Sequence, residues 1–179
     1  MSASELTRQA IVTATRQLAS EKPFQKISVL EITRLCGINR NTFYYYIDDK
    51  YDVIQWIFNQ ELMPVLLAQQ PKMSLAESVS ALCAFLKTRK AFYSRILEDS
   101  NPRCLRSLLV QYYKQFLIEM AMPHFEEYRI PDAHQEIAAR FYAHGTVGMI
   151  CDWAARDMRM DSAFATSIIQ LSAREKFFV

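Results

Sequence analysis

The stretch N-R-N-T-F-Y-Y-Y-I, from Asn39 to Ile47, is the part of this chain that best indicates its fold and its function. If it forms a helix, Phe43 and Ile47 lie one turn apart and can anchor one side of that helix to a core. The opposite side then carries Arg40, Asn41, Tyr44 and Tyr45. Arg and Asn side chains can bind base edges through paired hydrogen bonds, and Tyr hydroxyls can bind phosphate. The stretch therefore predicts a helix that contacts DNA.

The residues before this stretch predict a second helix and a tight turn. Ser28 and Glu31 have the spacing of a capping box, in which each side chain accepts a hydrogen bond from the backbone N–H of the other residue. Gly37 can supply the positive φ that a sharp corner between two helices needs, and Asn39 can cap the helix that follows. The two helices and the turn predict a helix-turn-helix unit, whose second helix enters the major groove of DNA.

The whole chain predicts an all-α fold. Only 3 of its 179 residues are glycine, helix-forming residues dominate, and apolar residues recur at helical spacing. Prolines and capping residues divide the chain into about nine helices. They lie near residues 4–20, 28–35, 39–47, 49–64, 74–88, 90–98, 104–122, 132–158 and 162–172. We expect a helix-turn-helix DNA-binding domain over 1–50 and a helical regulatory and dimerisation domain over 51–179, connected by the helix at 49–64.

Charge and composition restrict the classes of partner. Residues 1–50 hold seven Lys or Arg and five Asp or Glu, whereas residues 51–179 hold fourteen of each. The net charge of +2 therefore lies in the segment with the predicted DNA-binding helix, which suits a polyanionic partner. No apolar run reaches the roughly 18 residues of a membrane span, and the N-terminus lacks the apolar region of a signal peptide. We expect a soluble, cytoplasmic protein without membrane contact.

Metal and cofactor sites have no support in the sequence. The three histidines are His124, His134 and His144. Their spacing of ten residues does not place them on one helix face, so no metal site is expected. The four cysteines are Cys36, Cys83, Cys104 and Cys151. They form no C-x-x-C pair and lie among apolar neighbours, which favours core packing. A redox sensor is the alternative for Cys104, because this residue follows a proline turn.

The segment from Arg8 to Val53 resembles the DNA-binding head of TetR-family bacterial transcriptional regulators. The residues that carry the resemblance are Ile11, Ala14, Phe24, the segment Ile27–Ile32, Cys36–Ile38, Thr42–Ile47 and Lys50. Together they form a specific pattern, although each alone would be weak. The remainder resembles the family only in its helical architecture, which in the family serves dimerisation and often ligand sensing. The resemblance implies a regulator, here a repressor, that binds double-stranded DNA at a palindromic operator as a homodimer and is released by a small-molecule effector.

The resemblance also implies roles for individual residues. Base- or phosphate-contacting positions of the recognition helix are matched by Arg40, Asn41, Thr42, Tyr44 and Tyr45. Ser28 matches the cap of the helix that crosses the DNA backbone, and Lys50 matches a phosphate-binding lysine that opens the fourth helix. A cation at a helix N-terminus is mildly unfavourable because of the helix dipole, and a phosphate lying across Lys50 would remove that objection. Family members frequently carry His where this chain has Tyr46.

Two groups of residues in the second half have candidate functions. Gly145 and Gly148 lie inside a long predicted helix, where each costs roughly 1 kcal/mol relative to Ala. We expect them, with Met149, to allow close helix packing in a dimer interface, and a kink is the alternative. Aromatic side chains could line an effector pocket, although residues at helical spacing more often belong to a plain core. The candidates are Phe85, Tyr93, Tyr113, Phe116 and Trp153.

Other classes of function fit the sequence less well. An enzyme is not expected, because the chain has no Gly-rich phosphate loop, no metal-ligand spacing and no signature of a catalytic triad. A helical adaptor, or an activator controlled by a protein co-regulator rather than by a small molecule, is the alternative. The choice between repressor and activator depends on where the operator lies relative to the promoter, which the protein sequence does not contain.

Overall fold

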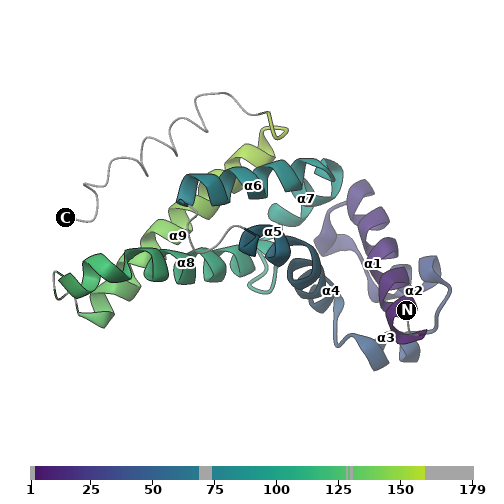
Figure 1. The fold of residues 1–179 in the computed structure, drawn as a ribbon. Coiled ribbons are helices and arrows are strands. Elements are labelled where there is room, and N and C mark those ends of the chain that lie inside the picture. Colours follow the sequence, from purple (N-terminus) through teal and green to yellow (C-terminus); the bar gives the residue numbers. More distant parts are fainter. Residues whose placement is uncertain (1–2, 69–73, 128, 130, 160–179) are drawn as a thin grey trace.

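The computed structural model describes residues 3–68, 74–127, 129 and 131–159, with side chains for all of these except 3 and 121–127. Within these residues all regular secondary structure is helical and no strand occurs, which confirms the all-α prediction. No helix in this part of the chain is both long and apolar enough to cross a membrane. Figure 1 shows an elongated molecule, with the N-terminal helices at one end and the last two labelled helices, α8 and α9, at the other.

In chain order the helices are α1 (Ala3–Glu21), α2 (Val29–Cys36), α3 (Arg40–Tyr46), α4 (Lys50–Ile57), α5 (Met63–Leu67), α6 (Leu75–Lys87), α7 (Lys90–Leu97), α8 (Leu105–Glu127) and α9 (Asp132–Ala155). A 3-10 turn at Phe24–Lys26 precedes α2, and a π-helical turn at Phe58–Leu62 joins α4 to α5. The helix predicted at 162–172 lies outside the described residues.

The head, which we define as α1 to α3, contains the predicted helix-turn-helix. Gly37 ends α2 with a φ of +68°, the left-handed conformation that glycine adopts without steric cost. The Ile38 N–H then donates to the Thr33 carbonyl at 3.1 Å, which closes the corner. Ile32 and Phe43 are fully buried on the inner sides of α2 and α3. The sequence pattern thus predicted both helices and the turn between them.

The connecting helix does not end at Pro64 as the sequence predicted. α4 passes into the π-helical turn Phe58–Leu62, and α5 then begins at Met63 with Pro64 in its first turn. Proline is tolerated in the first turn of a helix, because its missing N–H has no helical partner to lose there. The π-helical turn before α5 therefore provides a new helix start, where proline is tolerated, between two helices that follow each other without a loop.

A second proline also fails to end a helix. We predicted a break at Met122 and Pro123, but α8 continues through both residues to Glu127. An internal proline removes one backbone hydrogen bond and costs about 3 kcal/mol or more. α8 packs lengthwise against α9 (Figure 1), and this tertiary packing outweighs the local cost.

The head and the body, which we define as α5 to α9, share one hydrophobic core. A single cluster of buried residues includes Ile11 and Phe43 in the head and Leu86 and Tyr113 in the body. α1 packs against α7 as well as against α4. The division at residue 50 therefore separates functions that we predict, but it does not separate two hydrophobic cores.

A carboxylate strengthens this junction. Glu61, in the π-helical turn, forms an ion pair with Arg16 of α1. Its other oxygen accepts from Arg89 at 3.0 Å and from the Tyr93 hydroxyl at 3.3 Å. Burial and the neighbouring Arg89 lower the pKa of Arg16 from its usual value, whereas the charge of Glu61 supplies the compensating partner. One acid therefore links α1 to the start of α7.

Candidate nucleic-acid interface

Helix α3 divides into a buried side and an exposed side, as its sequence predicted. Phe43 is fully buried and the following Ile47 is 6% exposed, so this side belongs to the core. Arg40 and Asn41 are exposed on the other side. The Tyr45 side chain is 81% exposed, an unusual position for a large aromatic residue in a protomer without a partner. The structure therefore leaves the predicted DNA-contacting side of α3 open.

The N-terminus of α3 is capped by Asn39. The Asn39 side-chain oxygen accepts from the Thr42 N–H at 2.7 Å and from the Thr42 hydroxyl at 3.1 Å. The Thr42 hydroxyl proton is thereby engaged inside the helix, although its oxygen can still accept. Asn41, which follows the cap, projects from the first turn of α3. This local geometry holds the first turn rigidly while its polar side chains stay accessible.

Arg40 and Tyr44 interact along the exposed side of α3. They lie one turn apart, and the Arg40 guanidinium donates to the Tyr44 hydroxyl at 3.2 Å. The guanidinium carbon also lies 5.4 Å from the centre of the Tyr44 ring. A guanidinium that stacks on an aromatic ring loses rotamer freedom before it binds a ligand. The pair presents the planar fork of Arg40 in a restricted orientation.

The end of α3 is supported by a cation that the sequence analysis missed. The Arg8 guanidinium lies 5.9 Å from the centre of the Tyr46 ring, which in turn packs edge-to-face on Tyr45. Tyr46 is half-buried by these neighbours, whereas Arg8 is exposed. No periodicity within α1 or α3 could have indicated this contact, because it joins two helices that are separated in the chain by the whole of α2.

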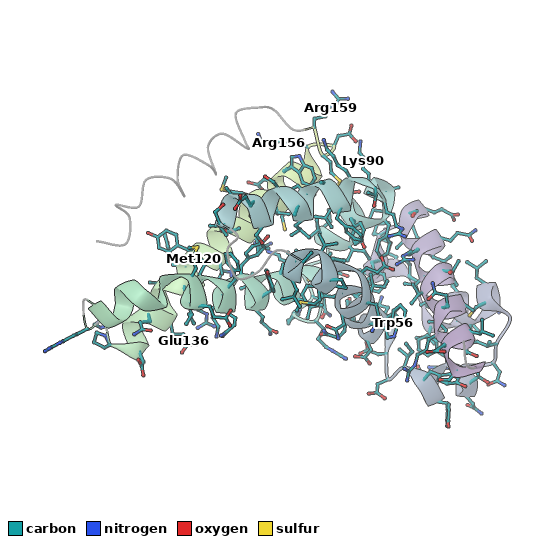
Figure 2. All side chains as sticks on the ribbon, in the orientation of Figure 1. Trp56, Lys90, Met120, Glu136, Arg156 and Arg159 are labelled. Carbon is teal, nitrogen blue, oxygen red and sulfur yellow. The ribbon has the colours of Figure 1, made fainter. Side chains whose placement is uncertain are left out.

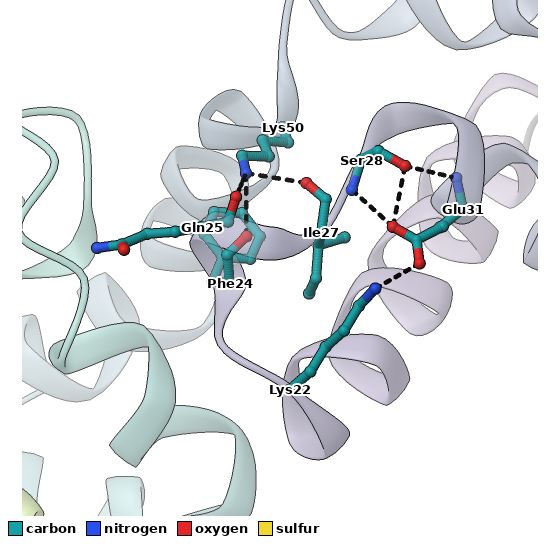
Figure 3. Close-up of polar contacts among 7 residues, drawn as sticks. All are labelled: Lys22, Phe24, Gln25, Ile27, Ser28, Glu31 and Lys50. Carbon is teal, nitrogen blue, oxygen red and sulfur yellow. Dashed lines mark hydrogen bonds and ion pairs between the residues drawn. The ribbon is translucent and has the colours of Figure 1, made fainter.

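Ser28 forms the predicted capping box with Glu31, and Lys22 binds the same Glu31 carboxylate (Figure 3). Its hydroxyl accepts from the Glu31 N–H at 3.3 Å and donates to the Glu31 carboxylate at 2.9 Å, and that carboxylate also accepts from the Ser28 N–H. Lys22 forms an ion pair with the other carboxylate oxygen. These hydrogen bonds, first the one from Lys22, lower the pKa of Glu31 to about 2. Both hydrogen-bonding functions of the Ser28 hydroxyl are therefore already used.

Lys50 has a position that differs from the predicted one. Figure 3 shows its ammonium group directed at the 3-10 turn, where it donates to the carbonyls of Phe24, Gln25 and Ile27 at 3.0, 2.9 and 2.9 Å. An ammonium group has three N–H donors, so none is left over for a phosphate in this conformation. Burial lowers the pKa of Lys50, whereas the charges of Asp99 and Asp49 raise it. The structure therefore gives Lys50 an internal role, which the pattern of a lysine after α3 did not reveal.

The five aromatic residues predicted to line an effector pocket pack in or against the core. Tyr93 and Tyr113 are fully buried, and their hydroxyls interact with Glu61 and with Ser78. Phe116 is 6% exposed and Phe85 packs on Tyr93. These contacts favour the plain-core interpretation for four of the five. The indole N–H of the buried Trp153 has no hydrogen-bond partner among the described residues.

Two surface clefts lie elsewhere. One of about 410 Å³ lies between the end of α1, the outer side of α7 and the end of α9, and one of about 390 Å³ lies between α1 and α2. Neither is lined by any of the five aromatic candidates. At the first cleft, Lys90 and Arg159 both bind Asp157 beyond the end of α9. Figure 2 shows Lys90 and Arg159 close together at this end of the molecule. This ion-pair group is exposed and polar, unlike the predicted pocket.

The predicted dimer residues lie on an open side of α9. Gly145 is exposed, and Gly148 and Met149 are half-buried. A Cβ atom added at either glycine would lie more than 4 Å from every described atom outside the adjoining part of α9, so no packing contact among the described residues requires glycine there. One and two turns earlier on α9, the side chains of Phe141 and Ile137 are 74% and 66% exposed. The sequence analysis did not single out Ile137, because an exposed apolar residue has the same helical spacing as a buried one.

Cysteine and metal chemistry receive no support from the described residues. No group of three or more His, Cys, Asp or Glu side chains in this part of the chain could hold a metal ion. Cys104 is only 1% exposed, so the alternative of an exposed redox sensor there was wrong. The cysteines are unpaired thiols, and burial raises the pKa of Cys83 to about 12, which makes this thiol unreactive.

Profiles of known protein families match both parts of the chain. The profile of the tetR family of bacterial regulatory proteins matches residues 11–55. A profile described as a transcriptional regulator C-terminal region, also of the TetR type, matches residues 74–174, which is more than half of the chain. The chain belongs to the TetR family. As a TetR-family transcriptional regulator it is a DNA-binding helix-turn-helix protein and not an enzyme.

Two relatives of known name are also regulators of this family. The dhaKLM operon transcriptional activator DhaS of Lactococcus lactis is 25% identical over 96 residues. That match covers 54% of this chain and 51% of DhaS, so it spans about half the length of that relative. The transcriptional regulator UidR of Escherichia coli strain K12 is 23% identical over 174 residues, which cover 90% of this chain and 89% of UidR.

Three solved structures have the same fold. DhaS, the dihydroxyacetone kinase operon activator, superimposes with a TM-score of 0.63 at 19% identity over 94% of this chain and 95% of its own. GusR of Salmonella enterica gives 0.62 at 21%, over 97% and 96% of the two chains. NalD of Pseudomonas aeruginosa, the secondary repressor of the MexAB-OprM multidrug efflux pump, gives 0.63 at 22%, also over 97% and 96%. At these identities the likeness establishes the TetR-family fold.

Proposed function

We propose that this TetR-family regulator binds a pseudo-palindromic operator as a homodimer and places one α3 helix in each of two successive major grooves. The exposed polar side of α3 carries this proposal. Arg40 and Asn41 can form paired hydrogen bonds to base edges, and Tyr45 is exposed to bind a phosphate. Two recognition helices related by a two-fold axis then read half-sites about 34 Å apart.

The remaining head residues have supporting roles in this proposal. Tyr44 orients Arg40, and Thr42 contributes its hydroxyl oxygen and its place in the capped first turn. Ser28 and Lys50 act at a distance. Their hydrogen bonds fix the start of α2 and the 3-10 turn, and so the angle at which α2 and α3 meet the DNA backbone. Their contribution therefore differs from a direct phosphate contact, which adds to the salt dependence of binding.

The homodimer rests on the open side of α9. Ile137 and Phe141 form an exposed apolar stripe that continues to Gly145 and Gly148 along one side of the helix. Glycines on such a stripe let a facing helix approach closely. A second copy of α9 is the partner that buries the stripe, with Met149 at its edge, in a self-complementary interface of the kind that two-fold symmetric dimers use.

The regulator acts as a repressor that an effector releases. A small-molecule effector enters the body next to Trp153, whose buried indole N–H has no hydrogen-bond partner in the part of the chain that the structure describes and can donate to it. The alternative is an activator under a protein co-regulator. Both activation and repression occur among similar proteins: DhaS is named an activator and NalD a repressor.

Selection from a library of randomised duplexes tests the core of this function. The full-length protein should enrich palindromes and bind the best of them at least about a thousandfold more tightly than a scrambled duplex. Binding should weaken steeply as salt increases, because phosphate contacts release counterions. Equal affinity for selected and scrambled duplexes would contradict the proposal. A reporter gene with the selected site overlapping its promoter then separates repression from activation.

A further inference from the structure

The loop between α7 and α8, residues 98–104, lies in the body but contacts the start of α4, which directly follows the recognition helix in the chain. Arg103 in this loop forms ion pairs with Asp49 and Asp52 at the start of α4. We propose that Arg103 is a positioning residue for the recognition helix, acting through the first turn of α4. This inference rests on the proposed function of α3, and it assigns part of the DNA-binding apparatus to the body.

The geometry at the start of α4 shows why the contact matters. Each carboxylate uses one oxygen inside the helix cap and the other for Arg103. Asp49 accepts from the Tyr51 N–H at 2.6 Å through Oδ1 and binds the guanidinium through Oδ2. Asp52 accepts from the Asp49 N–H at 2.9 Å through Oδ2 and binds the guanidinium through Oδ1. The guanidinium therefore fixes both carboxylates of the capping box at once.

The loop itself is held in place by a chain of side-chain hydrogen bonds. Asp99 Oδ1 accepts from the Asn101 N–H at 2.8 Å, and Asn101 Oδ1 accepts from the Arg103 N–H at 2.8 Å. Asp99 is only 2% exposed, and it also accepts from the Tyr51 hydroxyl and from the Gln25 side chain, each at 3.2 Å. The loop thus reaches the start of α4 from a fixed base.

The start of α4 is coupled to α3 by a very short connection. Only Ile47 and Asp48 separate the last residue of α3, Tyr46, from the cap residue Asp49. Ile47 is buried, and its N–H donates to the Phe43 carbonyl at 3.0 Å, so the connection has little slack. A shift of the first turn of α4 must therefore shift or rotate α3. Arg103 opposes such a shift from the body side.

A positioning role must be separated from a simple charge effect, and the two predict opposite signs at Asp52. If Arg103 acts only as a nearby cation, removing its charge weakens binding to the polyanion and removing the Asp52 charge strengthens it. If Arg103 positions α3 through the ion pair, both changes weaken binding. The double change is then no worse than the stronger single change, because both variants break the same contact.

The test measures operator affinity for Arg103→Gln, Asp52→Asn and the double variant, with Arg106→Gln as a control. Arg106 is exposed in the first turn of α8, and its variant has the same charge change. We expect about a fivefold loss for each single variant, about fivefold for the double variant, and partial recovery with Arg103→Lys. The slope of log affinity against log salt should stay that of the wild type. Tighter binding by Asp52→Asn, additive losses, or wild-type affinity of Arg103→Gln would each overturn the inference.

A second measurement does not depend on DNA. Amide hydrogen exchange within 44–52 should be faster in Arg103→Gln than in the wild type or in Arg106→Gln, while exchange in α9 stays unchanged. Unchanged exchange in 44–52 would overturn the inference even if the protein binds no palindrome. Failure of the wild-type protein to bind any palindrome, together with faster exchange in the variant, would instead contradict the proposed function and leave the positioning contact intact.

Discussion

Helices α3 and α9 each leave one side open, but the chemistry of the two open sides is opposite. α3 exposes hydrogen-bonding and cationic groups, with Arg40 and Asn41 beside the aromatic Tyr45. α9 exposes the apolar side chains of Ile137 and Phe141. The same side of the helix continues with Gly145 and Gly148, which have no side chain. A polar open side suits phosphates and base edges, whereas an apolar one is stabilised only when another protein surface covers it. We infer that the two sides need different partners, DNA for α3 and a second copy of the chain for α9, and the first two predictions below test the two sides separately.

We expect the largest effect from placing a large side chain at Gly148 of α9. Gly148→Leu should shift the protein from dimer to monomer in sedimentation velocity and weaken operator binding at least about a hundredfold, because the two half-sites no longer act together. The described part of the chain has room for the first atom of the new side chain, since no described atom outside the adjoining part of α9 lies within 4 Å of an added Cβ. Its folding should therefore be unimpaired by circular dichroism. Gly148→Ala is the control with a smaller side chain, and a dimeric Gly148→Leu protein would show that this side of α9 is not the interface.

On α3, Arg40→Ala should cost about 1–3 kcal/mol in binding to the selected operator, with a smaller loss on scrambled DNA. The reason is that a guanidinium fork recognises a base edge, whereas a scrambled site offers only phosphate. Arg40→Lys keeps the charge without the fork, so it should recover binding to scrambled DNA but not the preference for the operator. Fluorescence anisotropy with both duplexes measures this. Sedimentation should show an unchanged dimer, and equal losses on the two duplexes would mean that Arg40 contacts only the backbone.

The third prediction concerns the hydrogen bonds from Lys50 to the 3-10 turn before α2. Lys50→Met keeps the apolar stem and removes three hydrogen bonds to carbonyls of the 3-10 turn. We expect a loss of about 1–2 kcal/mol in the free energy of unfolding, measured with denaturant. Lys26→Met, an exposed lysine of the same turn, is the control and should change stability little. A phosphate contact by Lys50 would instead appear as a lower salt dependence of DNA binding at unchanged stability.

The smallest effect concerns the capping box of α2 in the head and that of α6 in the body. Hydrogen bonds from Lys22 and Ser28 lower the pKa of Glu31 in the folded state from its usual 4.5 to about 2, so its stabilising contribution is present above pH 4.5 and is lost as the pH falls towards 2. Glu31→Gln should remove that part of the acid dependence of unfolding. Glu77 makes the same box with Ser74, and none of the causes that lower its pKa is a lysine. Glu77→Gln should therefore change the acid dependence less, and a larger change would contradict the role of Lys22.

The sequence predicted the fold well wherever the signal was local. The capping box at Ser28, the positive φ of Gly37 and the buried and exposed sides of α3 all depend on residues within one or two helical turns. The sequence prediction was wrong at Pro64 and Pro123, where it ended a helix. A π-helical turn lets α5 begin around Pro64, and tertiary packing stabilises α8 through Pro123. Local patterns do not contain that information.

The candidate site was predictable in part, for a related reason. A single helix pattern is enough to place Arg40 and Asn41 on the outside. It cannot show that Lys50 turns inward to three carbonyls, or that Arg103 reaches the start of α4 from the body. The same limit applies to the aromatic candidates in the body. Only the packed structure distinguishes a core tyrosine such as Tyr113 from Trp153, whose indole N–H has no hydrogen-bond partner among the described residues.

The π-helical turn at Phe58–Leu62 makes the chain tolerant of a particular genetic change. A π turn holds more residues than an α turn, so loss of a single codon there would let the segment become regular α-helix. One residue corresponds to about 100° of rotation and about 1.5 Å of length in an α-helix. A deletion in the regular part of α4 would therefore rotate α5 and everything after it by this amount, whereas a deletion within the π turn removes only the residue that the wide turn absorbs. An in-frame deletion should therefore be tolerated better in this short stretch than in α4 itself.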